Sequence, residues 1–279
     1  MIQNLMPHKE KDSIKEHFRI SDKLSNFIHG DFAYPHKFDF SLSIFVLSGE
    51  AEGEINLRKF KLTAPCILYI FPDQILRNIY SSDNFAARYV MLSRDFADSL
   101  LTYMQNNISI STLHNPIIDL SESEKEIITV HLDNLQQIID DTENPYRLDC
   151  IKHTLAAFFY RGWYKYHSNA CNDTYKSNVV DKFLMSVQQH CRKHRFVSFY
   201  SEQATLSVKH LSRLVKRSTG QTAAKWIEKY VILEAQAMLK SSNMTIQQIS
   251  EELNFPSQSF FGKYFKIRVG ISPKEYRSL

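Results

Sequence analysis

The sequence predicts an α+β chain in two parts. The first is a small β-barrel followed by a helical hairpin, and the second is an all-α domain with two helix-turn-helix units joined by a long helix. Short apolar segments at strand spacing occur within residues 38–92, capped amphipathic helices occupy residues 174–279, and the net charge changes sign between the two parts.

The composition limits the class of protein. Of the 279 residues, 43% are hydrophobic and 23% are charged, as in a folded chain of about two domains. The longest apolar runs, 66–71 and 44–47, are far shorter than the roughly 20 residues of a membrane-spanning helix, and the N-terminus has no apolar signal region. The four cysteines show no C-x-x-C spacing. We therefore expect a cytoplasmic protein with reduced thiols and no membrane partner.

Charge divides the chain near residue 173. Residues 1–173 carry a net charge of −6 and residues 174–279 a net charge of +10. The boundary lies in a polar stretch, 166–174, which is typical of a linker. We place the first domain at 1–170 and the second at 174–279. A basic domain joined to an acidic one suggests that the second part binds a polyanion such as nucleic acid.

The first domain begins with short strands. Apolar residues alternate at 38–44, and further short apolar segments at 55–57, 66–71 and 89–92 are separated by glycine and proline turns. This pattern predicts a small antiparallel barrel or jelly roll. The aromatic residues of these strands either line a pocket or fill the core; they are Phe38, Phe40, Tyr69 and Phe71.

Metal-dependent catalysis is disfavoured in this barrel. Its histidines, His29 and His36, precede the first strong strand instead of clustering with glutamates. His190 and His194 flank Cys191 at helical spacing, but Cys191 belongs to an apolar stripe and no third ligand is near. We predict no metal and no other cofactor.

Two helices are expected after the barrel. Ser121 and Glu124 form a capping box before an apolar stripe at 127–139, and a second stripe follows Pro145 over 148–166. These helices either cap the barrel or pair with a second copy of the chain, and the sequence leaves both alternatives open.

The second domain opens with an amphipathic helix over 180–191. Ser198 is expected to cap a short helix that ends at Ala204, and Ser207 caps the next helix after a tight turn, with Gly220 ending it. This spacing predicts a helix-turn-helix unit. A longer helix capped by Thr222 follows, over about 223–240.

The same arrangement recurs further along the chain. Thr245 and Gln248 form a capping box for a short helix that ends near Asn254, and Ser257 opens the next helix, which Gly270 ends. Phe260, Phe261 and Phe265 are predicted to form its core stripe. A final helix is expected from the cap, proline and capping-box glutamate of residues 272–275.

The long helix between the units sets their separation. Eighteen residues extend about 27 Å at ~1.5 Å per residue, close to the ~34 Å between successive major grooves on one face of DNA. The two second helices, which begin near Ser207 and Ser257, are therefore predicted to occupy successive grooves.

The motifs of the second domain resemble those of the AraC/XylS transcription regulators. Residues 246–266, followed by 270–277, are similar to the family signature, and 206–216 with Thr219 and Gly220 match its first unit. The resemblance implies an effector-responsive regulator that binds double-stranded DNA, contacts RNA polymerase and forms a homodimer. It also implies that the barrel is cupin-like and binds a small-molecule effector, whose residues the sequence does not identify.

Site residues follow from helix geometry together with this resemblance. Base contacts are predicted for residues on the solvent faces of the two second helices: Lys209, Ser212, Arg213, Gln258, Ser259 and Lys263. Backbone contacts are predicted for basic residues and helix starts: Ser198, Lys216, Thr245, Lys266 and Arg268. Gly262 replaces the larger polar residue usual in the family, so readout by the second unit is expected to be poorer.

Two other functions stay open from the sequence. One is a cupin-type enzyme with a DNA-binding appendage, although we find no catalytic serine motif, glycine-rich phosphate loop or H-E-x-x-H sequence and expect no enzyme. The other is a regulator whose barrel only mediates protein interactions.

Overall fold

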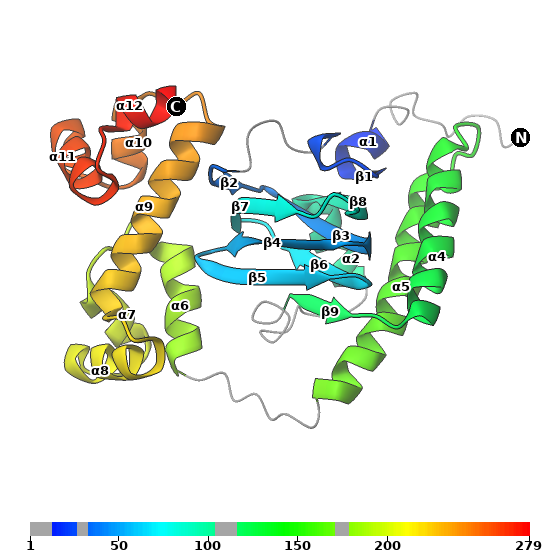
Figure 1. Cartoon of the computed structure of the whole chain (residues 1–279), viewed down its shortest axis with the longest axis horizontal. Coiled ribbons are helices and arrows are strands. Elements are labelled where there is room, and N and C mark those ends of the chain that lie inside the picture. Colours follow the sequence, from blue (N-terminus) through cyan, green and yellow to red (C-terminus); the bar gives the residue numbers. More distant parts are fainter. Residues whose placement is uncertain (1–12, 27–32, 104–115, 171–178) are drawn as a thin grey trace, which may run out of the picture.

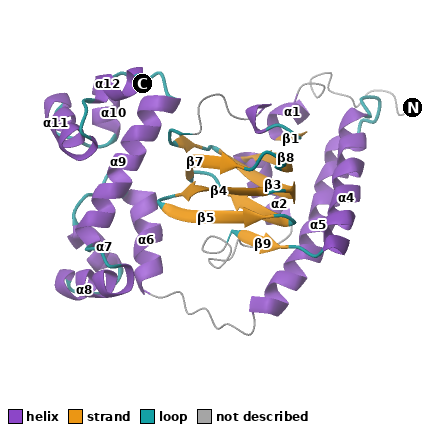
Figure 2. Ribbon diagram, viewed as in Figure 1, coloured by secondary structure: helices purple, strands orange, loops and turns teal. Residues whose placement is uncertain are grey.

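The computed structural model describes residues 13–26, 33–103, 116–170 and 179–279. A β-rich part lies between a helical hairpin on one side and a helical domain on the other (Figures 1 and 2). This arrangement confirms the predicted fold class. Within the described residues, no helix combines the length and apolar character needed to cross a membrane.

Nine strands build two antiparallel sheets in the described part of the chain. One sheet has the order β1-β8-β3-β6-β9 and the other the order β2-β7-β4-β5. The strands are β1 Phe18–Ser21, β2 His36–Lys37, β3 Phe40–Ser48, β4 Glu50–Ile55, β5 Arg58–Thr63, β6 Cys66–Ile70, β7 Ile75–Ser81, β8 Ala86–Ser93 and β9 Ile117–Asp119.

The space between the sheets is filled by side chains. The inward-facing residues Leu42, Leu68, Ile70 and Met91 are almost completely buried in one cluster, because alternate residues of each strand point to the same face. A second cluster lies between the outer face of the five-stranded sheet and the helices α1 (Ser13–His17), α2 (Arg94–Tyr103), α4 (Glu122–Asp140) and α5 (Arg147–Ala170). Strands and hairpin thus share an apolar layer that neither could bury alone.

The β4–β5 turn differs from the prediction. Leu57 was expected to continue a strand, but β4 ends at Ile55, and Asn56 and Leu57 form a two-residue turn with φ of 49° and 68°. Both values fall in the left-handed region that tight hairpins require. Asparagine tolerates this conformation and leucine does not, so Leu57 is strained. It packs against apolar residues of the helical domain, which offsets the strain.

The helical domain contains α6 (Val179–His190), α7 (Val197–Gln203), α8 (Val208–Thr219), α9 (Ala223–Ser241), α10 (Ile246–Glu252), α11 (Gln258–Val269) and α12 (Pro273–Ser278). The expected side-chain caps at Ser121, Ser207, Thr222, Thr245, Ser257 and Ser272 all form. Ser198 is an exception, because the N-cap of α7 is Phe196, which makes no side-chain bond.

The predicted linker is only partly described. Helix α5 continues to Ala170, so residues 166–170 are helical and the linker prediction is wrong for them. Residues 171–174 of the predicted linker lie outside the described part of the chain, and the domain limits 1–170 and 174–279 stay predictions. Burial raises the pKa of the Cys191 thiol to about 12 and that of Cys66 to about 11, so neither forms an appreciable thiolate at neutral pH.

Candidate nucleic-acid interface

The two helix-turn-helix units repeat each other closely. The second helices α8 and α11 each have 12 residues, a serine N-cap and a glycine C-cap with positive φ. The turns before them contain Thr205 and Asn254, with φ of 53° and 54°. The order of buried and exposed positions in 211–220 recurs unchanged in 261–270. The repeat predicted from the caps is therefore a structural repeat.

Helix α9 connects the units and separates them. It has 19 residues, or about 28 Å at ~1.5 Å per residue. Helices α8 and α11 lie near its two ends, both on the side away from the barrel (Figure 1). The second helices of the two units, α8 and α11, are called the recognition helices below. They therefore share one outer side of the molecule.

Direct contacts between the units fix this arrangement. Arg195, in the α6–α7 loop, donates a hydrogen bond to the backbone oxygen of Asn254 at 2.6 Å and lies 4.0 Å above the centre of the Phe255 ring. The Asn254 side chain donates in return to the Lys193 oxygen at 3.1 Å. Helix α8 is joined to the connecting helix α9 by a bond from the Trp226 indole N–H to Thr219 Oγ1 at 2.8 Å. These bonds hold the two recognition helices as one unit.

Most of the predicted base-contacting side chains are accessible. Lys209, Arg213, Gln258, Ser259 and Lys263 are exposed, and Ser212 is half-buried. Beneath them, Leu211, Val215, Phe261 and Phe265 are fully buried in the core of the helical domain. The buried stripe thus turns the polar face of each recognition helix toward solvent. The individual base contacts stay predictions.

The predicted backbone contacts are placed less uniformly. Lys216 and Lys266 are exposed in the last turns of α8 and α11. The Thr245 N–H already bonds to Gln248 Oε1 at 2.7 Å, so a phosphate at this end needs the next N–H groups. Ser198 lies inside the first turn of α7 and caps nothing.

Arg268 is held within the domain. Its guanidinium bonds to Glu228 at 2.8 Å, and it lies 3.5 Å from the centre of the Tyr264 ring. Burial alone would raise the pKa of Glu228, but hydrogen bonds from Lys225 and Arg268 hold it below its ordinary value. The carboxylate is therefore charged at neutral pH and keeps Arg268 engaged. A phosphate contact by Arg268 stays a prediction and would compete with this pair.

Phe260 corrects the predicted core stripe. Phe261 and Phe265 are completely buried, whereas Phe260 is 54% exposed on the first turn of α11. Gly262, on the same helix, has open space around the position of a Cβ. Both residues change the surface that α11 presents. A helical-wheel projection places Phe260 beside the buried stripe, which is the signal in the sequence that could have identified it.

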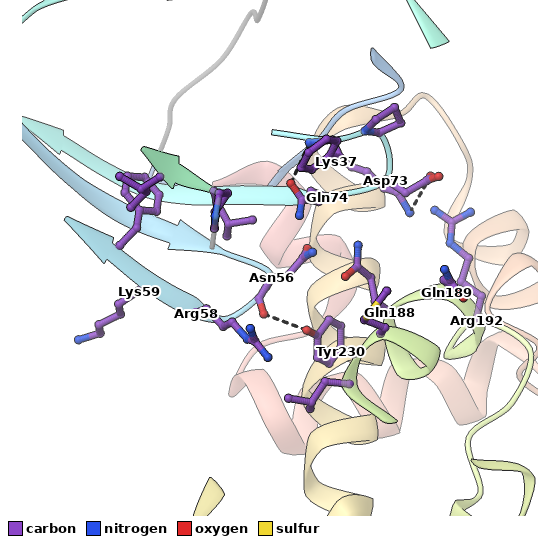
Figure 3. Close-up of a pocket in the computed structure, with 18 of the residues that line it drawn as sticks. Lys37, Asn56, Arg58, Lys59, Asp73, Gln74, Gln188, Gln189, Arg192 and Tyr230 are labelled. Atoms are coloured by element: carbon purple, nitrogen blue, oxygen red, sulfur yellow. Dashed lines mark hydrogen bonds and ion pairs between the residues drawn. The ribbon is translucent and has the colours of Figure 1, made fainter. Parts of the chain in front are cut away.

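A second site lies between the barrel and the helical domain. A cavity of about 600 Å³ is bounded by β-strand residues on one side and by α6 and α9 on the other (Figure 3). Among the residues that line it, one carries a carboxylate, Asp73, and the cationic residues are more numerous. The cationic residues are Lys37, Arg58, Lys59, Lys61 and Arg192. Phe71 lines this cavity, Tyr69 lies on the hairpin side, and Phe38 and Phe40 pack into the barrel core. The predicted aromatic set is thus divided among three environments.

Ionic contacts cross the boundary beside this cavity. Glu234 of α9 has a side chain that is only 3% exposed, and it accepts from Lys37 Nζ of β2 at 2.9 Å and from Arg192 Nη2 at 2.9 Å. The Tyr230 hydroxyl donates to the backbone oxygen of Asn56 at 3.1 Å, and Leu233 packs on Ile75. None of these residues was predicted from the sequence, in which a glutamate within the apolar part of the long helix was the available signal.

Metal ligation is absent from the described part of the chain, where no group of three or more His, Cys, Asp or Glu residues could hold an ion. The His194 ring stacks on Phe199 with a centroid distance of 3.7 Å, and His190 meets the same ring edge-on. This pair therefore has a packing role. His36 is buried, and His29 lies outside the described residues.

Comparisons with known proteins agree with the helical geometry. The family model described as a helix-turn-helix domain matches residues 200–278. The HTH-type transcriptional activator RhaR of Escherichia coli O1:K1 / APEC is 20% identical over 254 residues, which are 88% of this chain and 86% of RhaR. The chain is a DNA-binding transcription regulator whose C-terminal part is a helix-turn-helix domain of the AraC/XylS type.

Other relatives match this regulator in its C-terminal part. The HTH-type transcriptional activator AarP of Providencia stuartii is 25% identical over 103 residues, which are 37% of the regulator and 76% of AarP. An uncharacterized HTH-type transcriptional regulator of Bacillus subtilis, YfiF, is 36% identical over 74 residues, which are 26% of the regulator and 23% of YfiF.

Solved structures of similar proteins include a full-length match and a DNA complex. An apo form of ToxT from Vibrio cholerae strain SCE256, carrying a single substitution, aligns with 93% of the regulator and 96% of its own chain, at 17% identity and a TM-score of 0.46. The DNA-binding domain of AdpA in complex with a target DNA aligns with 36% of the regulator and 91% of its own chain, at 21% identity and a TM-score of 0.34.

Proposed function

We propose that this regulator binds specific sequences in double-stranded DNA, in the cytoplasm, by placing α8 and α11 in two successive major grooves. The observation that carries the proposal is the pair of exposed recognition helices on one side of the domain, joined by α9, which is about 28 Å long. The net charge of +10 on residues 174–279 supplies attraction to the phosphates.

Arg213→Ala tests base reading by α8. The guanidinium is exposed in mid-helix, where it can donate two hydrogen bonds to guanine. We expect the variant to lose about 1 to 3 kcal/mol of affinity for a selected cognate site and almost none for random DNA. Titration of both DNAs at several salt concentrations measures the difference.

Lys266→Ala is the matched control for this experiment. If Lys266 contacts a phosphate, removing its side chain should weaken binding to every sequence and flatten the salt dependence by about one unit. Equal losses of Arg213→Ala on cognate and random DNA would reassign Arg213 to the backbone.

We further propose that a small acidic effector binds in the cavity between the barrel and the helical domain. Its lining combines Lys59 and Arg58 of the barrel with Arg192 after α6, so one ligand contacts both parts. A ligand that binds one relative placement of the parts more tightly shifts the population toward it. The structure of the interface thus supports an effector-responsive regulator.

Thermal unfolding in the presence of a library of small carboxylic acids tests this proposal. A true effector should raise the unfolding temperature with increasing concentration, because it binds only the folded chain. Lys59→Glu, which reverses one charge of the cavity lining, should reduce that shift. If no acid raises the temperature, the interpretation of the barrel as a protein-interaction module is favoured instead.

The exposed residues of the hairpin support a homodimer as a second candidate role of the first domain. Val130 of α4 and Tyr160 of α5 are 67% and 49% exposed, although both helices bury their other faces against the sheet. We propose that these faces pair between two copies of the chain. We also propose that this regulator is an activator, as RhaR and AarP are, and that it acts through contact with RNA polymerase.

A further inference from the structure

The recognition helix α11 presents an aromatic ring to solvent. Phe260 is the third residue of this helix and is 54% exposed, while its neighbours Gln258 and Ser259 are exposed polar residues. Helix α8 carries His210 at the equivalent position, 50 residues earlier. Because residues near the N-terminus of a recognition helix are those that contact base edges, the ring lies where readout occurs.

The Phe260 ring has an aromatic neighbour within the domain. Its centroid lies 6.2 Å from that of Phe255, at an angle of 37° between the rings. Phe255 is itself buried and lies under the Arg195 guanidinium. Phe260 stays more than half exposed beside this neighbour, so its ring is an accessible apolar surface.

Gly262 adds to the apolar character of this surface. The equivalent residue of α8 is Ser212, so a hydroxyl present in the first unit is missing from the second. Because a Cβ at Gly262 would meet no atom within 4 Å, packing does not require glycine there. The missing side chain lets α11 approach a groove more closely at this turn.

The chemistry of the major groove then selects a base. Thymine is the base that presents an apolar group there, its C5-methyl, and phenylalanine is among the side chains that contact it. We propose that Phe260 reads the methyl group of a thymine in the half-site bound by α11. This proposal rests on the proposed function, and it gives α11 a specificity of its own where Gly262 suggested poorer readout.

Thymine-to-uracil replacement tests the proposal directly, since uracil forms the same base pair without the methyl group. A site is first selected from random double-stranded DNA with the full-length chain, and each thymine is then replaced singly. We expect wild-type affinity to fall about fourfold at a thymine of the α11 half-site, the equivalent of burying one methyl group. Arg213→Ala identifies the other half-site, because it relaxes specificity there.

Phe260→Ala should bind the thymine and uracil sites equally well. Ile267→Ala is the matched control, since Ile267 is on the same helix, is 79% exposed and lies beyond its first turns, so the fourfold preference should persist. Phe260→Leu, which keeps an apolar side chain, should retain part of it. Thermal unfolding of each variant verifies that it folds.

If Phe260→Ala still prefers thymine to uracil, or if uracil has no effect in the α11 half-site of the wild type, the proposal is overturned. Neither result would affect the proposal that the chain binds DNA. Failure of the wild type to select any sequence would instead overturn the proposed function, and this inference with it.

Discussion

Glu234→Ala should lower the free energy of unfolding by about 3 kcal/mol, the lower end of the range for breaking a buried ion pair. The Glu234 carboxylate is shared by Lys37 and Arg192, whose side chains are only 17% and 31% exposed. Its removal leaves two cations poorly solvated. The loss is kept small because Arg192 also pairs with Glu252 at 3.0 Å and Lys37 with Asp73 at 3.5 Å.

Urea denaturation followed by circular dichroism measures this effect. Glu252→Ala is the matched control, because Glu252 pairs with the same arginine but is 46% exposed, and its loss should be below about 1 kcal/mol. Glu234→Gln keeps the shape of the side chain and removes its charge, so it separates charge from packing. Equal losses for the Glu234 and Glu252 variants would mean that the buried carboxylate contributes no more than a surface pair.

The position of this pair connects stability with the proposed regulation. Glu234 is on α9, the helix that spaces the two recognition helices, while Lys37 is on the barrel. A ligand in the adjacent cavity lies beside Lys37 and Arg192, both of which line it. Loss of the Glu234 pair should therefore change the effect of a bound effector on DNA affinity more than it changes the affinity of either domain for its own ligand.

Phe261→Ala should lower the free energy of unfolding by about 3 to 5 kcal/mol, whereas Phe260→Ala should change it by less than about 0.5 kcal/mol. The first ring is completely buried and packs against Phe255 and Phe265, so its removal leaves a cavity in the core of the helical domain. The second ring is 54% exposed and loses little when it is truncated.

Chemical denaturation of the two variants in parallel measures this difference. Because the substitutions are identical and adjacent in the chain, they differ only in the surroundings of the ring. A large loss for Phe260→Ala would mean that its ring is part of the core, and would remove the basis for thymine reading as well.

Local signals account for what could be predicted at the recognition helices. The serine and threonine caps, the capping boxes and the glycine ends involve residues within about four positions of each other, so their geometry follows from the sequence itself. The short helix was predicted to end near Asn254, and this residue has the left-handed conformation of a helix stop. The same local chemistry failed for Ser198, where Phe196 takes the N-cap position without a side-chain bond.

The sequence by itself determined the repeat: two helices of equal length, capped alike, with an amphipathic spacer whose length follows from its residue count. Tertiary structure decided how deeply each ring of the Phe260 and Phe261 pair is buried, because a helix fixes the directions of its side chains but not what packs against each. It also paired Glu234 with Lys37, 197 residues away, and placed Leu57 against the helical domain. Such contacts join segments distant in the chain, and no local pattern specifies them.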